Sequence, residues 1–406
     1  MFKRILNLGW KNVWRNPTRS GVVIIAVVLG TWAGIFIAAF MNGMVQDYLQ
    51  NQLNLSVGHL RIAQPQFEDQ FNPRYAIDNA QELLNSLEAK PYVQQALAQS
   101  LTTGLAQSAI NSYGVTIHGV NTETGPPHPV MEYLEQGRFP QEEIRNPVVV
   151  GDALAERLEL ETDSRMVLSF QDVEGNITAG AFRVAGIFDT FSSNYDRSNV
   201  IVRMEDLNTL LAAEHLIHRV TLTVDDFTRA DIYREELSRE FPGLEVSSWG
   251  EIAPELQYVF SMTDVSLYIF MIIIIIALVF SIINTMLMAI MERTRELGML
   301  MAVGMNQSRV FLMILSETFF LTMTGAPLGM LLSWGTISLL GKTGINLSAF
   351  SEGLNAYGLS TVIRPELGAD YYLAIALMIA VAAILSSLYP AWKALKLKPV
   401  EAIRKI

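Results

Sequence analysis

The sequence predicts a membrane α-helical protein with four transmembrane helices and one large α+β domain outside the cytoplasm. Half of the 406 residues are hydrophobic and only 17% are charged, whereas soluble domains carry roughly a quarter of charged residues. Four stretches contain the about 20 apolar residues that a helix needs to cross a bilayer. The long segment between the first and second stretches alternates strand patterns with amphipathic helix patterns, which predicts the separate domain.

The four spans are predicted at residues 21–41, 265–291, 310–340 and 371–389. A cleaved signal peptide is the alternative interpretation of the first span. Its apolar run is too long for a signal peptide, and the tripeptide Phe40-Met41-Asn42 lacks the small residues of a cleavage site. We therefore interpret the first span as a permanent anchor.

Basic residues gather next to the spans at both ends of the chain. The segment 1–20 holds five of them and no acid: Lys3, Arg4, Lys11, Arg15 and Arg19. The segment 390–406 also holds five, against the single acid Glu401: Lys393, Lys396, Lys398, Arg404 and Lys405. Because Lys and Arg collect in short cytoplasmic flanks, both termini are predicted to be cytoplasmic. The domain 42–264 and the loop 341–370 then lie outside, and the loop 292–309 lies inside.

The external domain is predicted to be an α+β domain of two subdomains. Seven short β-branched or aromatic runs predict strands: Gly58–Ile62, Gly114–Val120, Pro147–Val150, Met166–Phe170, Phe182–Phe188, Val200–Arg203 and Arg219–Val224. Three segments predict helices: Ala80–Ala89, Ala153–Leu158 behind an Asp152 cap, and Asp226–Phe241. The Gly- and Pro-rich segment 122–129 is typical of a loop between subdomains.

Few residues suggest catalysis. The chain has no cysteine, and the pair His215 and His218 lacks the further ligands of a zinc site, so both are interpreted as surface histidines on a helix or at its end. No metal site is expected. The tripeptide Gly341-Lys342-Thr343 resembles the end of a phosphate-binding loop, but it follows a span instead of a strand. If ATP is used, another chain must bind it.

Glu317 is the single acid inside a predicted span. An intramembrane carboxylate is a functional candidate by default because its burial is costly. Its position about two turns from Val310, near the cytoplasmic side, favours a structural role, in which it snorkels or caps a neighbouring helix. A proton relay would need acid or histidine partners in other spans, and the sequence contains none there.

Two cytoplasmic segments have a pattern of their own. The loop 292–309 begins with charges and continues with an apolar, Met-rich stretch, which indicates a contact surface, since exposed apolar patches usually mark contacts. A connector packed on its own bundle is the alternative. Near the N-terminus, Leu6, Trp10 and Val13 share one helical face, which favours a helix lying in the membrane interface. The alternative there is a charged leader without fixed conformation.

Three motifs resemble those of the MacB/FtsX/LolC-LolE family of ABC-transporter permeases, also called mechanotransmission transporters. They are WKNVWRNPTRS at residues 10–20, ERTRELG at 292–298 followed by AVGM at 302–305, and YPAWKA at 389–394 followed by PVEAIR at 399–404. Their order and spacing agree with the family over the whole chain. Glu317 also falls where this family commonly carries a glutamate.

The resemblance implies a bacterial inner-membrane subunit that has a MacB-like periplasmic core domain and is not itself an enzyme. In this family two permease chains, identical or homologous, pair with a cytoplasmic ATPase dimer of the LolD or MacB type, which binds ATP and Mg. No cofactor bound by this chain and no nucleic-acid partner are expected. The resemblance places ATPase coupling on Glu292, Arg293, Arg295, Glu296, Leu297, Gly298, Ala302, Gly304 and Met305.

The stretches 149–155 and 182–190 look like LolC and LolE, which extract lipoproteins from the inner membrane. By that resemblance, an acyl cleft would be formed by Trp32, Phe36, Phe40, Met41, Met44, Phe260, Met262 and Ile269. Ordinary lipid-facing or helix-packing side chains are the alternative, because apolar residues in a span need no special role. MacB-like efflux of peptides or drugs, and FtsX-like signalling to a cell-wall hydrolase, remain alternative functions. A periplasmic chaperone or adaptor would be a further partner.

Overall fold

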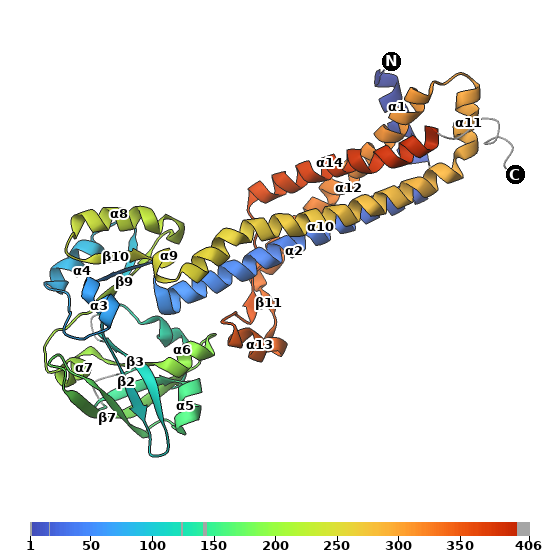
Figure 1. Cartoon of the computed structure of the whole chain (residues 1–406). Helices are drawn as coiled ribbons and strands as arrows, with labels where there is room; N and C mark the ends of the chain where they lie inside the picture. Colours follow the sequence, from blue (N-terminus) through green and yellow to red (C-terminus); the bar gives the residue numbers. More distant parts are fainter. Residues whose placement is uncertain (1, 16, 123–124, 141–143, 396–406) are drawn as a thin grey trace. The chain divides into compact units, whose positions relative to one another are not determined.

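The computed structural model describes residues 2–15, 17–122, 125–140 and 144–395 (Figure 1). The chain separates into two compact units. The first, called the membrane unit, comprises residues 1–45, 261–346 and 362–406, and the second, called the sheet unit, comprises residues 46–260 and 347–361. The closing motif at 399–404 and residues 123–124 of the predicted subdomain loop lie outside the described residues.

Four helices are long and apolar enough to cross a membrane, which confirms the prediction of four membrane helices. They are α2 (Pro17–Gln52), α10 (Pro254–Glu292), α12 (Gln307–Thr343) and α14 (Ala369–Leu395). Each begins before its predicted span and ends after it. The membrane unit also contains α1 (Phe2–Arg15), α11 (Thr294–Ala302) and the short strands β11 (Ile345–Asn346) and β12 (Val362–Ile363), which pair antiparallel.

Helices α2 and α12 approach each other closely at two glycines. A Cβ atom on Gly325 would lie 2.9 Å from the Val27 side chain, and one on Gly329 would lie 2.8 Å from the Thr31 side chain. Both distances are shorter than van der Waals contact, so only glycine fits. Small residues allow such close approach in membrane bundles, where packing replaces the hydrophobic effect as the force between helices.

The sheet unit contains a ten-stranded mixed sheet in the order β10-β1-β9-β2-β3-β8-β5-β7-β4, with β6 paired to β2 and β7. The strands are β1 (Leu60–Ala63), β2 (Val93–Gln107), β3 (Ser112–Val120), β4 (Leu134–Gly137), β5 (Pro147–Gly151), β6 (Arg165–Gln171), β7 (Ile177–Phe188), β8 (Asn199–Arg203), β9 (Arg219–Val224) and β10 (Glu245–Ser248). Two pairs, β3 with β8 and β5 with β7, are parallel. The unit is therefore an α+β domain, as predicted.

Helices and single turns cover the sheet. The helices are α3 (Pro65–Gln70), α4 (Ala80–Glu88), α5 (Asp152–Leu158), α6 (Ser193–Ser198), α7 (Met204–Leu210), α8 (Ala230–Glu240), α9 (Trp249–Ile252) and α13 (Ser351–Ala356). The 3-10 turns are η2 (Pro129–Tyr133), η3 (Phe227–Arg229) and η4 (Ser348–Phe350), and a π-helical turn, η1 (Leu53–Val57), follows α2 directly. Strand alternation builds the core, since Met166 and Leu168 of β6 are buried against Leu154 of α5.

All seven predicted strands are confirmed, but β2, β4 and β10 were not predicted. The longest strand, β2, is rich in Ala, Gln and Leu, residues that favour helices when considered alone. It is extended because it pairs along its length with β3, β6 and β9. Pairing and burial decide strand formation more than intrinsic preference does.

Two local predictions in the sheet unit are wrong. Asp152 does not cap α5, because the cap position is Gly151 and Asp152 lies in the first helical turn, where its charge still complements the helix dipole. His218 is fully buried at the edge of β9, accepting from the Leu101 N–H and contacting the Pro73 carbonyl. His215 is exposed in the preceding loop. Among the described residues, no three His, Cys, Asp or Glu side chains gather as a metal site requires.

Candidate coupling site

Helix α11 joins α10 to α12 and contains most of the predicted coupling loop. Arg293 has a non-helical backbone and separates α10 from α11. The helix ends where Val303 and Gly304 donate to carbonyls of its last turn. Gly304 has a φ of 104° and open space where a Cβ would be, so this position needs glycine for its backbone conformation. Its role is to end the helix before α12 begins.

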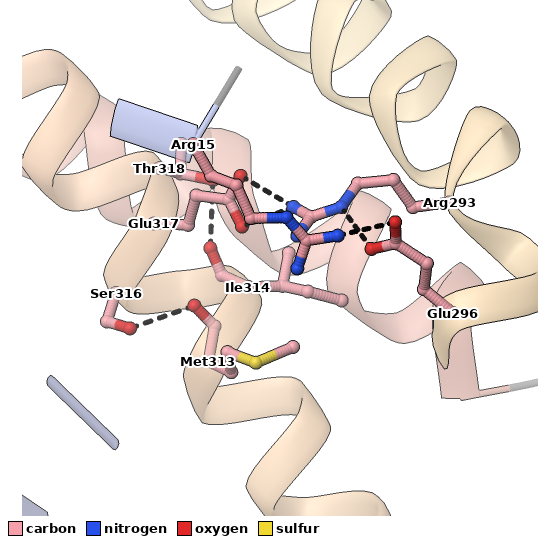
Figure 2. A network of polar contacts seen from close by, with 8 residues as sticks. All are labelled: Arg15, Arg293, Glu296, Met313, Ile314, Ser316, Glu317 and Thr318. Atoms are coloured by element: carbon pink, nitrogen blue, oxygen red, sulfur yellow. Dashed lines mark hydrogen bonds and ion pairs between the residues drawn. The ribbon is translucent and has the colours of Figure 1, made fainter. Parts of the chain in front are cut away.

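A continuous chain of ion pairs connects α1, α11 and α12 (Figure 2). Arg293 donates from Nη1 to both carboxylate oxygens of Glu317, at 3.1 and 3.3 Å. Its Nε donates to Glu296 at 3.2 Å, and the other oxygen of Glu296 accepts from Arg15 at 2.6 Å. The four side chains alternate in charge, so each carboxylate lies beside a guanidinium.

Burial changes steadily along this chain of charges. The Glu317 side chain is 4% exposed and that of Arg293 13%, whereas Glu296 and Arg15 are 42% and 55% exposed. A buried carboxylate is stable only when it is paired. Arg293 supplies that pair for Glu317 and is itself fixed at the start of α11. The buried pair therefore sets where α11 begins relative to α12.

The two faces of α11 differ in what they contact. Leu297 and Gly298 are buried against the membrane unit. Met299 and Leu300 of α11 are exposed, as is Val303 directly after the helix, by 85%. The loop is therefore anchored on its own bundle on one side and presents an apolar surface on the other. It has features of both interpretations of the sequence, a connector packed on its own bundle and a contact surface.

The predicted coupling residues divide in the same way. Leu297 and Gly298 are buried, Arg293, Glu296 and Met305 are partly buried, and Glu292, Arg295, Ala302 and Gly304 are exposed. The prediction missed Arg15, whose partner Glu296 lies 281 residues away in the chain. It also left out the exposed apolar side chains of α11, although their signal, apolar residues in a cytoplasmic loop, was present in the sequence.

The N-terminal helix packs on α12. Its Val13 is fully buried, and the Trp10 ring meets the Phe320 ring edge to face, with centroids 5.5 Å apart. Trp14 is more than half exposed. The alternative of a leader without fixed conformation is excluded, and α1 forms a further support beside Glu317, which is three residues before Phe320.

The residues predicted for an acyl cleft are distributed over both units. Trp32 stacks on Phe36 with ring centroids 5.9 Å apart and donates to the Thr336 hydroxyl at 3.2 Å. Phe260 belongs to the sheet unit, where it packs on Trp249. The others lie in the membrane unit, with Phe40, Met41 and Met44 partly buried and Met262 and Ile269 exposed. Their role in cargo binding stays a prediction.

A different apolar slot lies between α2, α10 and α14. Its walls include Gly30, Thr31 and Gly34 of α2, Met271 and Leu278 of α10 and Ile375 of α14. None of the eight predicted cleft residues lines it. The Thr31 hydroxyl is buried there without a partner among the described residues.

Two family models match the chain. The MacB-like periplasmic core domain matches residues 20–240, more than half of the chain, and the FtsX-like permease C-terminal model matches residues 268–399. The lipoprotein-releasing system transmembrane protein LolC of Haemophilus influenzae is 22% identical, over 95% of this chain and 93% of that protein.

The macrolide export ATP-binding/permease protein MacB of Salmonella choleraesuis is 23% identical, over 82% of this chain and 52% of that protein. The chain thus spans about half of MacB. The crystal structure of the periplasmic region of MacB from Actinobacillus actinomycetemcomitans is similar with 14% identity and a TM-score of 0.35, over 52% of this chain and 97% of that one. With four membrane helices and both family models matched in order, the chain belongs to the MacB/FtsX/LolC family of ABC transporter permeases, inner-membrane proteins with a periplasmic domain.

Proposed function

We propose that this permease couples ATP hydrolysis in a partner ATPase to a shape change of its periplasmic domain, and that its cargo is lipoprotein released from the inner membrane. The observation that carries the coupling is the exposed apolar face of α11, held by the buried Arg293–Glu317 pair. An apolar surface on a cytoplasmic loop is best satisfied by a protein partner. ATP and Mg are bound by that partner, and this chain contributes the docking helix.

The basic flanks support the orientation that docking requires. With Lys and Arg at both ends of the chain on the cytoplasmic side, α11 faces the cytoplasm and the sheet unit faces the periplasm. Helices α2 and α10 contain residues of both units. A displacement of α11 therefore has two continuous helices through which to reach the sheet unit, and no pore through the bilayer is needed.

Lipoprotein release is favoured over efflux by the extent of similarity. The LolC relative is matched over nearly its whole length, whereas the MacB relative is matched over about half. In this proposal a second permease, identical or homologous, pairs with the chain, and acyl chains enter beside the outer ends of α2 and α10. A periplasmic chaperone receives the cargo.

The coupling proposal is tested by placing a charge on the docking face. Val303→Glu should reduce co-purification of the ATPase by about tenfold or more, because burying an unpaired carboxylate in an apolar contact costs at least about 1.4 kcal/mol. Ile232→Glu, at an exposed apolar side chain of α8 in the sheet unit, is the matched control. Wild-type recovery of the ATPase with Val303→Glu would remove α11 as the docking helix.

The cargo proposal is tested separately. Photo-crosslinkers at Phe40 and Met262 should capture lipidated protein in intact membranes, and mass spectrometry of the purified complex identifies it. Labelling of bulk phospholipid alone would contradict an acyl cleft at these residues. Recovery of an adaptor with an outer-membrane channel would instead support efflux, and recovery of a cell-wall hydrolase would support signalling.

A further inference from the structure

A small polar cavity lies within the sheet unit, between strands of the sheet and the π-helical turn η1. Its volume is about 40 Å³, several times the roughly 10–15 Å³ that a single water requires. Its polar walls include Asn54 and Ser56 of η1, Gln99 of β2 and Arg219 of β9, together with Tyr195 and His128. The cavity has room for a ligand of a few non-hydrogen atoms.

The hydroxyl of Tyr195 lines this cavity without a partner. The residue is 8% exposed, and its hydrogen bonds to other described residues involve its backbone N–H and carbonyl. Burial, and after it the charge of Asp196, raise the pKa of Tyr195, so the hydroxyl keeps its proton and can donate. In the described parts of the chain no acceptor meets it, and the cavity leaves the hydroxyl accessible to a small ligand. The missing acceptor points to a ligand.

The orientation of His118 follows from its neighbours. Asn199 donates from Nδ2 to the Tyr195 carbonyl at 2.9 Å, which leaves its Oδ1 to face His118 Nε2, also at 2.9 Å. Burial lowers the pKa of His118 to about 4, so at neutral pH the ring has one proton, and this contact places it on Nε2. His118 Nδ1 is then an acceptor and receives the Gln99 amide at 3.3 Å.

The His128 ring is a second donor without an acceptor among the described residues. His128 Nδ1 accepts from the Val130 N–H at 3.3 Å, and burial lowers the pKa of His128 to about 3. The single proton of this ring is therefore on Nε2. The atom nearest to it is Gln99 Nε2 at 3.5 Å, which is itself a donor and cannot accept. His128 thus presents an N–H at the cavity wall with no acceptor among the described residues.

The cavity wall itself carries a positive charge, while Asp196, next to Tyr195 in the chain, adds a negative one nearby. Arg219 is its one charged wall residue, and no carboxylate lines it. Glu68 binds Arg219 through two hydrogen bonds, at 2.8 and 3.0 Å, but it also pairs with Arg61 at 3.4 Å. One carboxylate is therefore shared by two guanidinium groups. The electrostatic effect of Arg219 and Arg61 contributes, after burial, to the low pKa of His118, as a positive local potential requires.

We propose that this cavity binds a small monovalent anion, such as chloride, formate or acetate, which accepts from the Tyr195 hydroxyl and the His128 Nε2–H. The donors, the excess of positive charge and the volume all favour this class over a cation or a larger solute. Because η1 forms one wall, the anion would also stabilise the π-helical turn. π-Helical turns are rare in proteins, and a large share of those that exist lie at functional sites.

The test uses the full chain in mild detergent, with sodium chloride, formate or acetate added at constant ionic strength against sodium gluconate, whose anion is too large for the cavity. Hydrogen exchange at residues 53–57 is the readout. The three small anions should raise protection to a plateau, and gluconate should not. Equal protection in all four salts would mean that the cavity holds water only and would overturn the proposal.

A conservative variant identifies the ligand-binding hydroxyl. Tyr195→Phe keeps the ring in the core but removes the donor, so the anion concentration that gives half-maximal protection should rise by about tenfold. Tyr133→Phe, at a partly buried tyrosine that does not line the cavity, should leave that concentration unchanged. An unchanged value in Tyr195→Phe, or an equal rise in both variants, would contradict the site.

Discussion

Both units of this permease contain a cluster of buried and partly buried arginine and glutamate side chains. The two clusters differ in whether they extend to an exposed side chain at the protein surface. In the membrane unit, the pair Arg293–Glu317 continues through Glu296 to the exposed Arg15. In the sheet unit, Glu68 joins Arg61 and Arg219, and the Arg219 guanidinium lies 5.6 Å from the Phe71 ring centroid. The first cluster ends at a side chain that is 55% exposed, whereas no side chain of the second is more than 19% exposed.

The difference indicates what each cluster is for. An open chain of charges that crosses three helices can respond when a partner touches its exposed end. A compact cluster, whose partners lie on β1, α3 and β9, holds the strands and α3 together. We therefore expect changes in the membrane cluster to alter coupling, and changes in the sheet cluster to alter the stability of the sheet unit alone.

The largest effect is expected for Glu317→Ala. It leaves the Arg293 guanidinium buried without its main partner, and breaking a buried ion pair costs about 3–5 kcal/mol. Hydrogen exchange at residues 294–302 should become much faster, and ATPase co-purification should fall. The double variant Glu317→Leu with Arg293→Met removes both charges and should regain most of the protection. A single variant that exchanges like the wild type would contradict this role for the pair.

The next effect is expected for Glu68→Gln, which leaves Arg61 and Arg219 close together without a carboxylate. The sheet unit should lose about 2–3 kcal/mol of unfolding free energy, less than for a fully buried pair because Glu68 is partly exposed. Protection of the β1 and β9 amides reports this loss. ATPase co-purification should stay unchanged, and a reduction would remove the distinction between the clusters. Glu235→Gln, in the exposed pair with Arg239, is the control and should cost less than about 0.5 kcal/mol.

Acid should weaken the sheet unit through its buried histidines. Burial lowers the pKa of His218 and His118 to about 4 and that of His128 to about 3. Between about pH 6.5 and pH 4, the unfolded chain therefore binds more protons than the folded one. The free energy of unfolding that these neutral imidazoles contribute above about pH 6.5 is lost as the pH falls towards 4. Exchange of β2 and β9 amides, corrected for intrinsic rates, measures this loss. A flat profile would contradict neutral buried imidazoles.

One carboxyl group opposes that trend. Burial raises the pKa of Asp196 to about 7, so its contribution to stability is full in acid and is lost as the pH rises through 7. Asp196→Asn removes this contribution and should make the acid loss between pH 7 and pH 4 steeper. A shallower loss in the variant would show that Asp196 is ionised in the folded protein.

The smallest effect is expected for Arg15→Gln. Exposed ion pairs contribute about 0.2–1 kcal/mol and are screened by salt. ATPase co-purification should therefore fall by less than about threefold at low salt and not at all at high salt. Lys11→Gln, at an exposed side chain of the same helix, is the matched control. A large, salt-insensitive loss would mean that the network is less open than its exposed end suggests.

Much of the fold could be predicted because a helix that crosses a lipid bilayer needs about 20 consecutive apolar residues. Long apolar runs identified all four membrane helices, and β-branched runs identified seven strands. Strand β2 was missed because its Ala, Gln and Leu content carries no strand signal until its partners are known. The burial of His218 was missed for a similar reason, since its contacts with Leu101 and Pro73 come from distant parts of the chain.

The candidate site was predictable only in part. The loop 292–305 could be identified from its charges and apolar residues, and Glu317 from its place in a span. The connection between them could not, because the sequence does not show which of several arginines pairs with which acid. Arg293 was assigned to the loop and Glu317 to a span, and only the folded chain brings them to 3.1 Å.

The glycines of α12 have a consequence for movement. There is no room for even a methyl group between Gly325 and Val27 or between Gly329 and Thr31. Helices α2 and α12 are therefore closely interlocked at these two positions. Sliding one along the other would force backbone against side chain. We therefore expect α2 and α12 to tilt or rotate together when the start of α12 is displaced.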